Sequence, residues 1–154
     1  TAGRLMILAD TNILLRSSTL RTFNAPTVVQ ATTKLLAAGE ALVVAPQGYY
    51  EMWVVLTRPR AQNGFELGSA GARGEVDRIR ASFGLLTEPP DILETWLDLV
   101  TKYDVKGKPA HDARLVAMMI RHGVDRILTT NKSDFSRYTE VRAISAEDVL
   151  AGKA

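Results

Sequence analysis

Short apolar runs alternate along the chain with longer segments in which apolar residues recur at helical spacing. The short runs are typical of buried β-strands, and the periodic segments are typical of amphipathic helices. Strands are predicted over residues 4–9, 41–45, 126–130 and 141–144, with a further short strand over 85–86. Because these strands alternate with helices, the sequence predicts an α/β fold with a mostly parallel sheet.

Proline and glycine set the bounds of the predicted helices. The helix after the first strand begins at Asn24 and Pro26 and ends before Gly39, since proline suits the first turn of a helix and glycine suits its end. Pro46 begins the next helix, and Pro59 ends it. Further helices are predicted over residues 70–83, 91–103, 110–122 and 145–150, with loops over 60–69 and 106–109.

The composition fits one globular domain, expected to span residues 4–150. The chain has 154 residues, of which 46% are hydrophobic, enough to form a full core. It contains no cysteine, which excludes disulfide bonds and thiolate chemistry. Neither a membrane span nor a signal peptide is visible, so we expect a cytoplasmic protein. A formal net charge of +2 and a pI of about 9.0 permit a nucleic-acid partner without requiring one.

Four acidic residues stand at positions that suit a shared metal site. Asp10 follows the first predicted strand, and Asp134 follows the strand over 126–130. Glu51 and Asp112 lie near the beginnings of predicted helices. In parallel α/β sheets, ligands bind beyond the carboxyl ends of the strands, where these side chains are expected to meet. A cluster of carboxylate oxygens suits Mg²⁺ or Mn²⁺ rather than zinc.

Each of these residues also has a purely structural interpretation. Asp10 suits the cap of the turn that begins at Thr11, and Asn12 suits either a cap or the orientation of a neighbouring ligand. Asp112 stands in a first helical turn, where the helix dipole favours a carboxylate. Glu51 lies in an apolar stretch, so it is expected to be partly buried and to need a partner, of which a metal ion is one. Polar residues at 131–134 are also typical of a turn.

Other kinds of site find little support. Walker A, GxGxxG, HExxH and GxSxG motifs are absent, and two histidines without cysteine make a catalytic triad or zinc site improbable. A phospho-acceptor receiver domain is excluded because the second strand ends in Pro46 rather than in an acid. His111 suits a ligand or a structural residue. Tyr49, Tyr50 and Trp53 suit a core or a dimer contact. Five arginines suit either phosphate binding or a solvated surface: Arg58, Arg60, Arg73, Arg78 and Arg80.

The order of these motifs resembles the PIN domain, and within it the VapC-type toxins of bacterial type II toxin–antitoxin pairs. The resemblance rests on LADTN at residues 8–12, the helical Glu51 and Asp112, and TTNKSDF at residues 129–135. It implies a three-layer α/β/α fold with a mostly parallel sheet. It also implies an Mg²⁺- or Mn²⁺-dependent endoribonuclease that acts on RNA as a toxin, forms a homodimer and is blocked by an antitoxin protein.

The resemblance also carries residue roles. Asp10, Glu51, Asp112 and Asp134 match the family's acidic cluster, and Thr130 matches a hydroxyl residue at the strand end. Asn131 matches a position that is Asp in many members and Asn in others, which leaves the number of bound metals open. Our hypothesis makes Asp10 and Asp112 the main metal ligands. Glu51 then binds through water or positions the nucleophile, and Asp134 completes the set.

Two other functions remain open from the sequence. The first is an RNA-binding module with weak or lost nuclease activity, because Asn131 replaces a common aspartate and the net charge is modest. The second is a metal-dependent phosphatase or DNA nuclease on a similar sheet. The binding module predicts salt-dependent RNA binding without turnover in any divalent metal. Competition between RNA, DNA and small phosphoesters as substrates separates the phosphatase or DNA nuclease from a ribonuclease.

Overall fold

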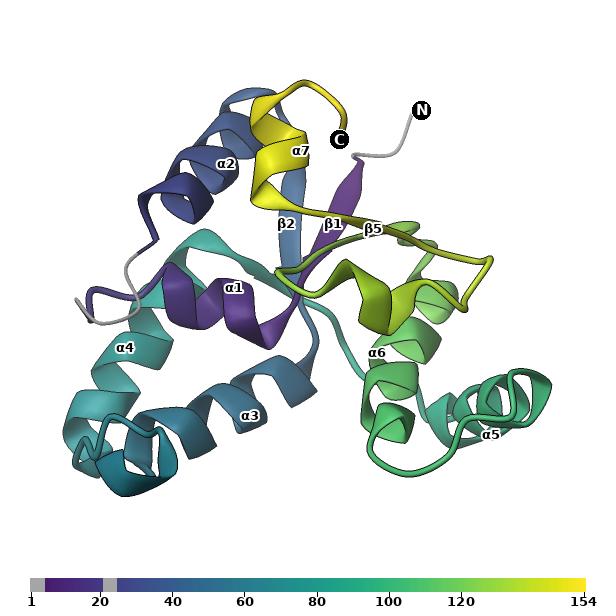
Figure 1. Cartoon of the computed structure of the whole chain (residues 1–154), viewed down its shortest axis with the longest axis horizontal. Coiled ribbons are helices and arrows are strands. Elements are labelled where there is room, and N and C mark those ends of the chain that lie inside the picture. Colours follow the sequence, from purple (N-terminus) through teal and green to yellow (C-terminus); the bar gives the residue numbers. More distant parts are fainter. Residues whose placement is uncertain (1–4, 21–24) are drawn as a thin grey trace.

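The computed structural model describes residues 5–20 and 25–154, and within them five parallel strands form one sheet (Figure 1). The strand order is β3-β2-β1-β4-β5, so β1 lies at the centre and has parallel neighbours on both sides. This confirms the predicted α/β fold. The strands are β1 (Met6–Ala9), β2 (Ala41–Val44), β3 (Gly84–Leu85), β4 (Arg126–Leu128) and β5 (Arg142–Ile144).

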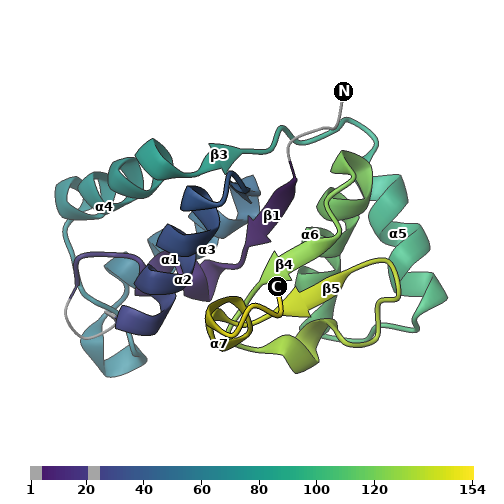
Figure 2. The ribbon, with the colours of Figure 1, turned by 90° about the horizontal axis from the view of Figure 1, so that it is seen from above.

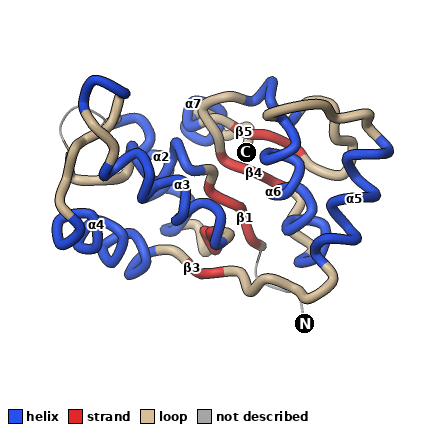
Figure 3. The backbone as a smooth tube through the Cα atoms, turned by 90° about the horizontal axis from the view of Figure 1, so that it is seen from below, coloured by secondary structure: helices blue, strands red, loops and turns tan. Residues whose placement is uncertain are grey.

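Helices cover both faces of the sheet, which gives the three layers of the prediction. Figure 2 and the opposite view in Figure 3 place α2, α3 and α4 on one side of β1, and α5 and α6 on the other. The helices are α1 (Thr11–Arg16), α2 (Pro26–Ala37), α3 (Pro46–Thr57), α4 (Ser69–Ser82), α5 (Ile92–Lys102), α6 (Pro109–His122) and α7 (Ala146–Leu150). Two 3₁₀ turns, η1 (Arg60–Gln62) and η2 (Lys132–Phe135), lie within loops.

The central strand divides its side chains between two hydrophobic cores. Ile7 and Ala9 pack in the core beneath α1–α4 and α7, whereas Leu8 packs in the core beneath α5 and α6. In the sheet, Leu8 is paired with Val43 of β2 and Ile127 of β4, and both belong to the same core as Leu8. This division follows from the two-residue period of a strand, which points successive side chains to opposite faces.

Most helix ends agree with the signals in the sequence. Gly123 follows α6 with a φ of +67°, the left-handed conformation that glycine adopts without a steric penalty. Ser145 caps α7 in a capping box with Asp148. The proposed cap Asn24 and the expected domain start at Arg4 fall outside the described residues. None of the described helices has the length and apolar character that a membrane span requires.

Two local elements differ from the expectation. Residues 11–16 form the short helix α1, where the sequence suggested only a turn, and its residues Ile13, Leu14 and Leu15 are buried. The strand predicted over 126–130 ends at Leu128, although the backbone N–H of Thr129 still donates to the carbonyl of Ile144 in β5 at 3.0 Å. Both differences lie at the carboxyl edge of the sheet, beside the acidic residues.

Candidate active site

Asp10 stands at the carboxyl end of the central strand and is 9% exposed. Its backbone N–H donates to the carbonyl of Leu128 at 3.0 Å, which ties it to β4. Its carboxylate accepts hydrogen bonds from the Thr11 backbone N–H at 2.8 Å, the Thr129 hydroxyl at 2.9 Å and the Asn12 amide at 3.3 Å. The capping interpretation is therefore confirmed, and the same carboxylate also lies in the acidic cluster described below.

The hydroxyl that reaches Asp10 belongs to Thr129, which is fully buried. The sequence matched the family's strand-end hydroxyl to Thr130, which stays a prediction; the side chain of Thr130 is exposed, and its backbone N–H donates to Asn12 Oδ1 at 3.2 Å. Asn12 thus links Asp10 to the end of β4, as the orienting interpretation expected. The backbone N–H of Asn131 donates to the Thr129 hydroxyl at 3.1 Å, and the Asn131 side chain is exposed.

Glu51 lies on the second turn of α3 and is partly buried, as the apolar stretch predicted. The Thr11 hydroxyl donates to its Oε2 at 2.8 Å, and the Gln47 amide donates to its Oε1 at 3.1 Å. Thr11 therefore contacts both Asp10, through its backbone, and Glu51, through its side chain. These contacts fix the orientation of the Glu51 carboxylate toward the strand end that carries Asp10.

The four acidic residues act on one another electrostatically. Burial, followed by repulsion from Asp10, Asp134 and Glu51, raises the pKa of Asp112 to about 6, and the neighbouring His111 opposes this. Burial likewise raises the pKa of Asp10, with smaller contributions from Glu51 and Asp134, although hydrogen bonds from Thr129 and Thr11 lower it. The topology therefore brings four carboxylates from four separate segments into one neighbourhood.

The donor set fits a hard divalent cation in chemistry, since it is made of carboxylate oxygens. Across residues 5–20 and 25–154, however, no three Asp, Glu or His side chains are drawn together closely enough to share one ion as they stand. Asp112 is half-buried in the first turn of α6, and Asp134 is exposed on η2. Neither carboxylate is held by a hydrogen bond or an ion pair to another described side chain.

Sequence reasoning missed Gln47, Thr11 and Thr129. The two threonines adjoin residues that were singled out, so a hydroxyl search around each acid would have found them. Gln47 carried no signal, because a glutamine just after a helix-starting proline is usually exposed, whereas this one is 8% exposed. The side chain of His111 is exposed, and only its carbonyl contacts the site region, by accepting from Gln47 at 2.9 Å.

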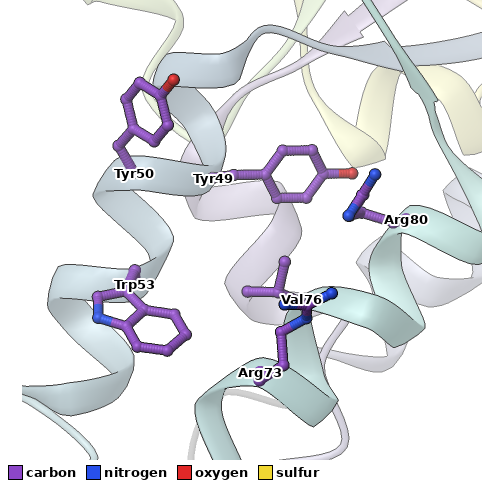
Figure 4. A pocket seen from close by; sticks show the side chains of 6 residues that line it. All are labelled: Tyr49, Tyr50, Trp53, Arg73, Val76 and Arg80. Atoms are coloured by element: carbon purple, nitrogen blue, oxygen red, sulfur yellow. The ribbon is translucent and has the colours of Figure 1, made fainter. Parts of the chain in front are cut away.

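A groove of about 390 Å³ lies between α3 and α4, away from the acidic residues (Figure 4). The hydroxyl of Tyr49 is buried without a hydrogen-bond partner among the described residues and points toward Arg80. Tyr50 is 68% exposed, so the core interpretation is wrong for this residue, whereas Tyr49 packs against the core. The groove is lined by Tyr49, Tyr50, Trp53, Arg73, Val76 and Arg80.

Three further arginines singled out in the sequence have local partners. Arg73 pairs with Asp77 at 2.9 Å, and Arg78 lies 3.7 Å from Glu75. Arg58 donates to the carbonyl of Asn63 at 3.2 Å. These contacts agree with a role in the surface structure of α4 and the loop before it.

Comparison with known families agrees with the arrangement of the sheet. The sequence model of the PIN domain matches residues 7–141, which is most of the chain. The chain therefore belongs to the PIN domain family. Comparison with curated protein sequences gives no significant match.

Solved structures show the same fold at low sequence identity. VapBC2 from Rickettsia felis, bound to a DNA fragment from its promoter, contains a chain with a TM-score of 0.70 and 12% identity, covering 92% of this chain and 98% of that one. PAE2754 from Pyrobaculum aerophilum has a TM-score of 0.64 and 18% identity, covering 99% and 98%. The toxin VapC20 of Mycobacterium tuberculosis, which cleaves the sarcin–ricin loop, has a TM-score of 0.59 and 16% identity, covering 88% and 98%.

Proposed function

We propose that the protein is an Mg²⁺- or Mn²⁺-dependent endoribonuclease and the toxin of a toxin–antitoxin pair. One observation carries the proposal: Asp10, Glu51, Asp112 and Asp134 come from four segments of the chain, and the charges of their neighbours help to raise the pKa values of Asp10 and Asp112 at the carboxyl edge of the sheet. Raised pKa values caused by repulsion between carboxylates are typical of functional sites, and a bound divalent cation removes that repulsion.

The chemistry follows from the charges of this cluster. A divalent ion bound there would lower the pKa of a water molecule and neutralise charge that develops on the phosphoryl oxygens. Asp10 and Asp112 are proposed to hold the ion, with Asp134 completing the set. Glu51 is proposed to contact it through water or to orient the attacking water, because Thr11 and Gln47 already hold its carboxylate in place. Thr129 and Asn12 keep Asp10 in a fixed rotamer.

RNA is the proposed substrate because of the family and because the structurally similar VapC20 cleaves the sarcin–ricin loop. An antitoxin is the proposed partner because similar folds occur in VapBC and FitAB complexes. The groove between α3 and α4 supports such a partner. Its aromatic lining suits an apolar segment, while Arg80 and the buried hydroxyl of Tyr49 suit a carboxylate on that segment.

A homodimer in the cytoplasm completes the proposal. Eleven large hydrophobic side chains are exposed among the described residues, including Leu93 and Leu97 on α5. Exposed apolar side chains favour self-association when they gather on one surface. Analytical ultracentrifugation of the purified protein measures its mass in solution, and a monomer at all concentrations would contradict this part of the proposal alone.

The decisive experiment is cleavage of a total-RNA pool in Mg²⁺, Mn²⁺ or EDTA by the wild type and by Asp112→Asn. Asp98→Asn, an exposed substitution on α5, is the matched control. We expect cleavage by the wild type and the control in the metals, none in EDTA, and none by Asp112→Asn. Competition with DNA and small phosphoesters separates a ribonuclease from a DNA nuclease or phosphatase.

An RNA-binding module without turnover is the second candidate. It is favoured by the exposed and uncharged Asn131 and by the separation of the carboxylates from one another. This function predicts RNA binding whose affinity falls steeply with salt, and no cleavage in any divalent metal. Filter binding at two salt concentrations, beside the cleavage assay, distinguishes the two candidates.

A further inference from the structure

The side-chain amide of Gln47 lies beneath the acidic cluster, on the first turn of α3, and is 8% exposed. Its nitrogen donates two hydrogen bonds, to Glu51 Oε1 at 3.1 Å and to the carbonyl oxygen of His111 at 2.9 Å. Its oxygen accepts a hydrogen bond from Arg114 Nη1 at 3.2 Å. Both amide protons are thus used within the protein, so Gln47 has none left to donate to a substrate.

These bonds join two helices that belong to different layers of the fold. α3 covers one face of the sheet and α6 covers the other. The hydrogen bond from Gln47 to the carbonyl of His111 joins these two helices. Glu51 lies one turn after Gln47 on α3, and His111 directly precedes Asp112 on α6. Gln47 therefore connects the segments that present two of the four carboxylates, which repel each other.

Arg114 determines which way the amide faces. If the amide were flipped, its oxygen would meet the Glu51 carboxylate and the His111 carbonyl, and its nitrogen would meet a guanidinium group. Every one of these contacts would bring two donors or two acceptors together. Arg114 is in turn paired with Glu88, from the segment that precedes α5. Four side chains are therefore linked by hydrogen bonds in a row in which donors and acceptors alternate: Glu88, Arg114, Gln47 and Glu51.

We propose that Gln47 is a positioning residue for the metal site, and that Arg114 acts through it. By joining Glu51 to the beginning of α6, Gln47 limits how far these two segments can move apart under the repulsion between Glu51 and Asp112. The inference rests on the proposed metal-dependent function and adds to it a residue that neither binds the metal nor touches RNA. Groups that orient metal ligands typically change metal affinity by about 10–100-fold when they are lost.

The test replaces Gln47 by methionine, which keeps the length and burial of the side chain but removes its hydrogen bonds. Gln30→Met, at an exposed helical glutamine on α2, is the matched control. Isothermal titration measures the Kd for Mn²⁺, and RNA cleavage at one Mn²⁺ concentration gives kcat and KM. We expect Gln47→Met to weaken Mn²⁺ binding about tenfold or more. We also expect kcat to fall while KM for RNA stays unchanged, because Gln47 does not contact RNA.

Arg114→Met is the second variant, for the case in which Gln47→Met fails to fold, since Arg114 is only partly buried. It should weaken Mn²⁺ binding in the same direction, because it removes the hydrogen bond that holds the amide oxygen of Gln47. In the double variant the two effects should not add, since Arg114 acts through Gln47. Thermal unfolding measurements establish that each variant is folded before its Mn²⁺ affinity is compared with that of the wild type.

The outcomes separate this inference from the proposed function. If the wild type binds Mn²⁺ and cleaves RNA, and folded Gln47→Met and Arg114→Met do so equally well, the role of Gln47 is wrong and the function stands. Additive losses in the double variant would contradict the link between Arg114 and Gln47. If the wild type neither binds Mn²⁺ nor cleaves RNA, both the function and the positioning role are wrong.

Discussion

The Thr129 hydroxyl donates to the Asp10 carboxylate at 2.9 Å, although 119 positions separate the two residues in the chain. The contact exists because β1 and β4 are parallel neighbours whose carboxyl ends meet at one edge of the sheet. The hydrogen bond lowers the pKa of Asp10 and so opposes the larger effect of burial. A buried hydroxyl thus keeps a buried acid closer to the ionised form that metal binding requires.

Thr129→Val should destabilise the protein, because it removes the hydrogen bond to Asp10 and leaves the N–H of Asn131 without its acceptor. We expect a loss of about 1–3 kcal/mol in the free energy of unfolding, the usual cost of an unsatisfied buried polar group. Urea denaturation measures it. Thr130→Val is the matched control, and its exposed side chain should give a change below about 0.5 kcal/mol. Equal losses in the two variants would contradict the assignment of the site hydroxyl to Thr129.

Asp112→Asn should stabilise the metal-free protein while it abolishes activity. The substitution removes a charge that burial and three neighbouring carboxylates disfavour, so the free energy of unfolding should rise by about 1–3 kcal/mol. Differential scanning calorimetry with EDTA measures the rise in Tm, and the same scan with Mn²⁺ should show a further rise for the wild type only. Unchanged Tm in EDTA would argue against the repulsion described for the cluster.

The pH dependence of stability follows from the same residue. Asp112 has a pKa of about 6 in the folded protein against 3.8 for an unperturbed aspartate, so the folded state holds its proton more tightly. The stabilisation that the proton on Asp112 gives the folded state is fully present below pH 3.8 and is lost as the pH rises through about 6. The metal-free wild type should therefore lose about 1–2 kcal/mol of stability between these values, less than the full pKa difference implies, because solvent screens the charge of a half-buried group.

Asp112→Asn provides the control for that pH series, since its loss across the same range should be clearly smaller. The raised pKa of Asp10 acts in the same direction and accounts for a remaining slope. Asp148 acts in the opposite direction, because its Lys132 contact lowers its pKa to about 2 and its contribution is lost only as the pH falls below 3.8. Urea titrations at several pH values measure all three effects.

Arg80→Glu should weaken binding of an antitoxin without reducing RNA cleavage, because Arg80 lines the groove between α3 and α4 rather than the acidic cluster. Co-expression with a small protein encoded beside the toxin, followed by affinity purification, measures the partner retained. Arg137→Glu, an equal change of charge at another exposed arginine, is the control. Equal retention by both variants would contradict the groove as the docking surface.

The sequence predicted the framework of this fold because the strands and most helices carry strong local signals. Apolar runs marked β1, β2, β4 and β5, and proline or glycine marked the ends of α3 and α6. α1 was missed because a six-residue helix between polar residues has too few positions to show a period. Its helical form depends on burial of Ile13, Leu14 and Leu15 against the core, which is a tertiary effect.

The acidic residues were found because an acid at a strand end or in a first helical turn has a recognisable place. Their gathering in one neighbourhood follows from the parallel order of the strands, which the alternation of elements predicted. The hydrogen-bond partners of these acids could not be predicted from the sequence in the same way. Whether Thr129 or Thr130 faces Asp10 depends on where β4 ends, and the contacts of Gln47 depend on how α3 and α6 approach across the sheet edge.

The alternation of side chains along β1 also bears on how such a fold tolerates divergence. Because Ile7 and Leu8 belong to different cores, a replacement beneath α2 and one beneath α5 meet no common neighbour and should change the free energy of unfolding additively. Each helical layer can then exchange its apolar side chains on its own, provided that volume and pattern are kept. Two independently variable layers around one shared strand give a physical reason why chains only 12–18% identical to this one retain its backbone.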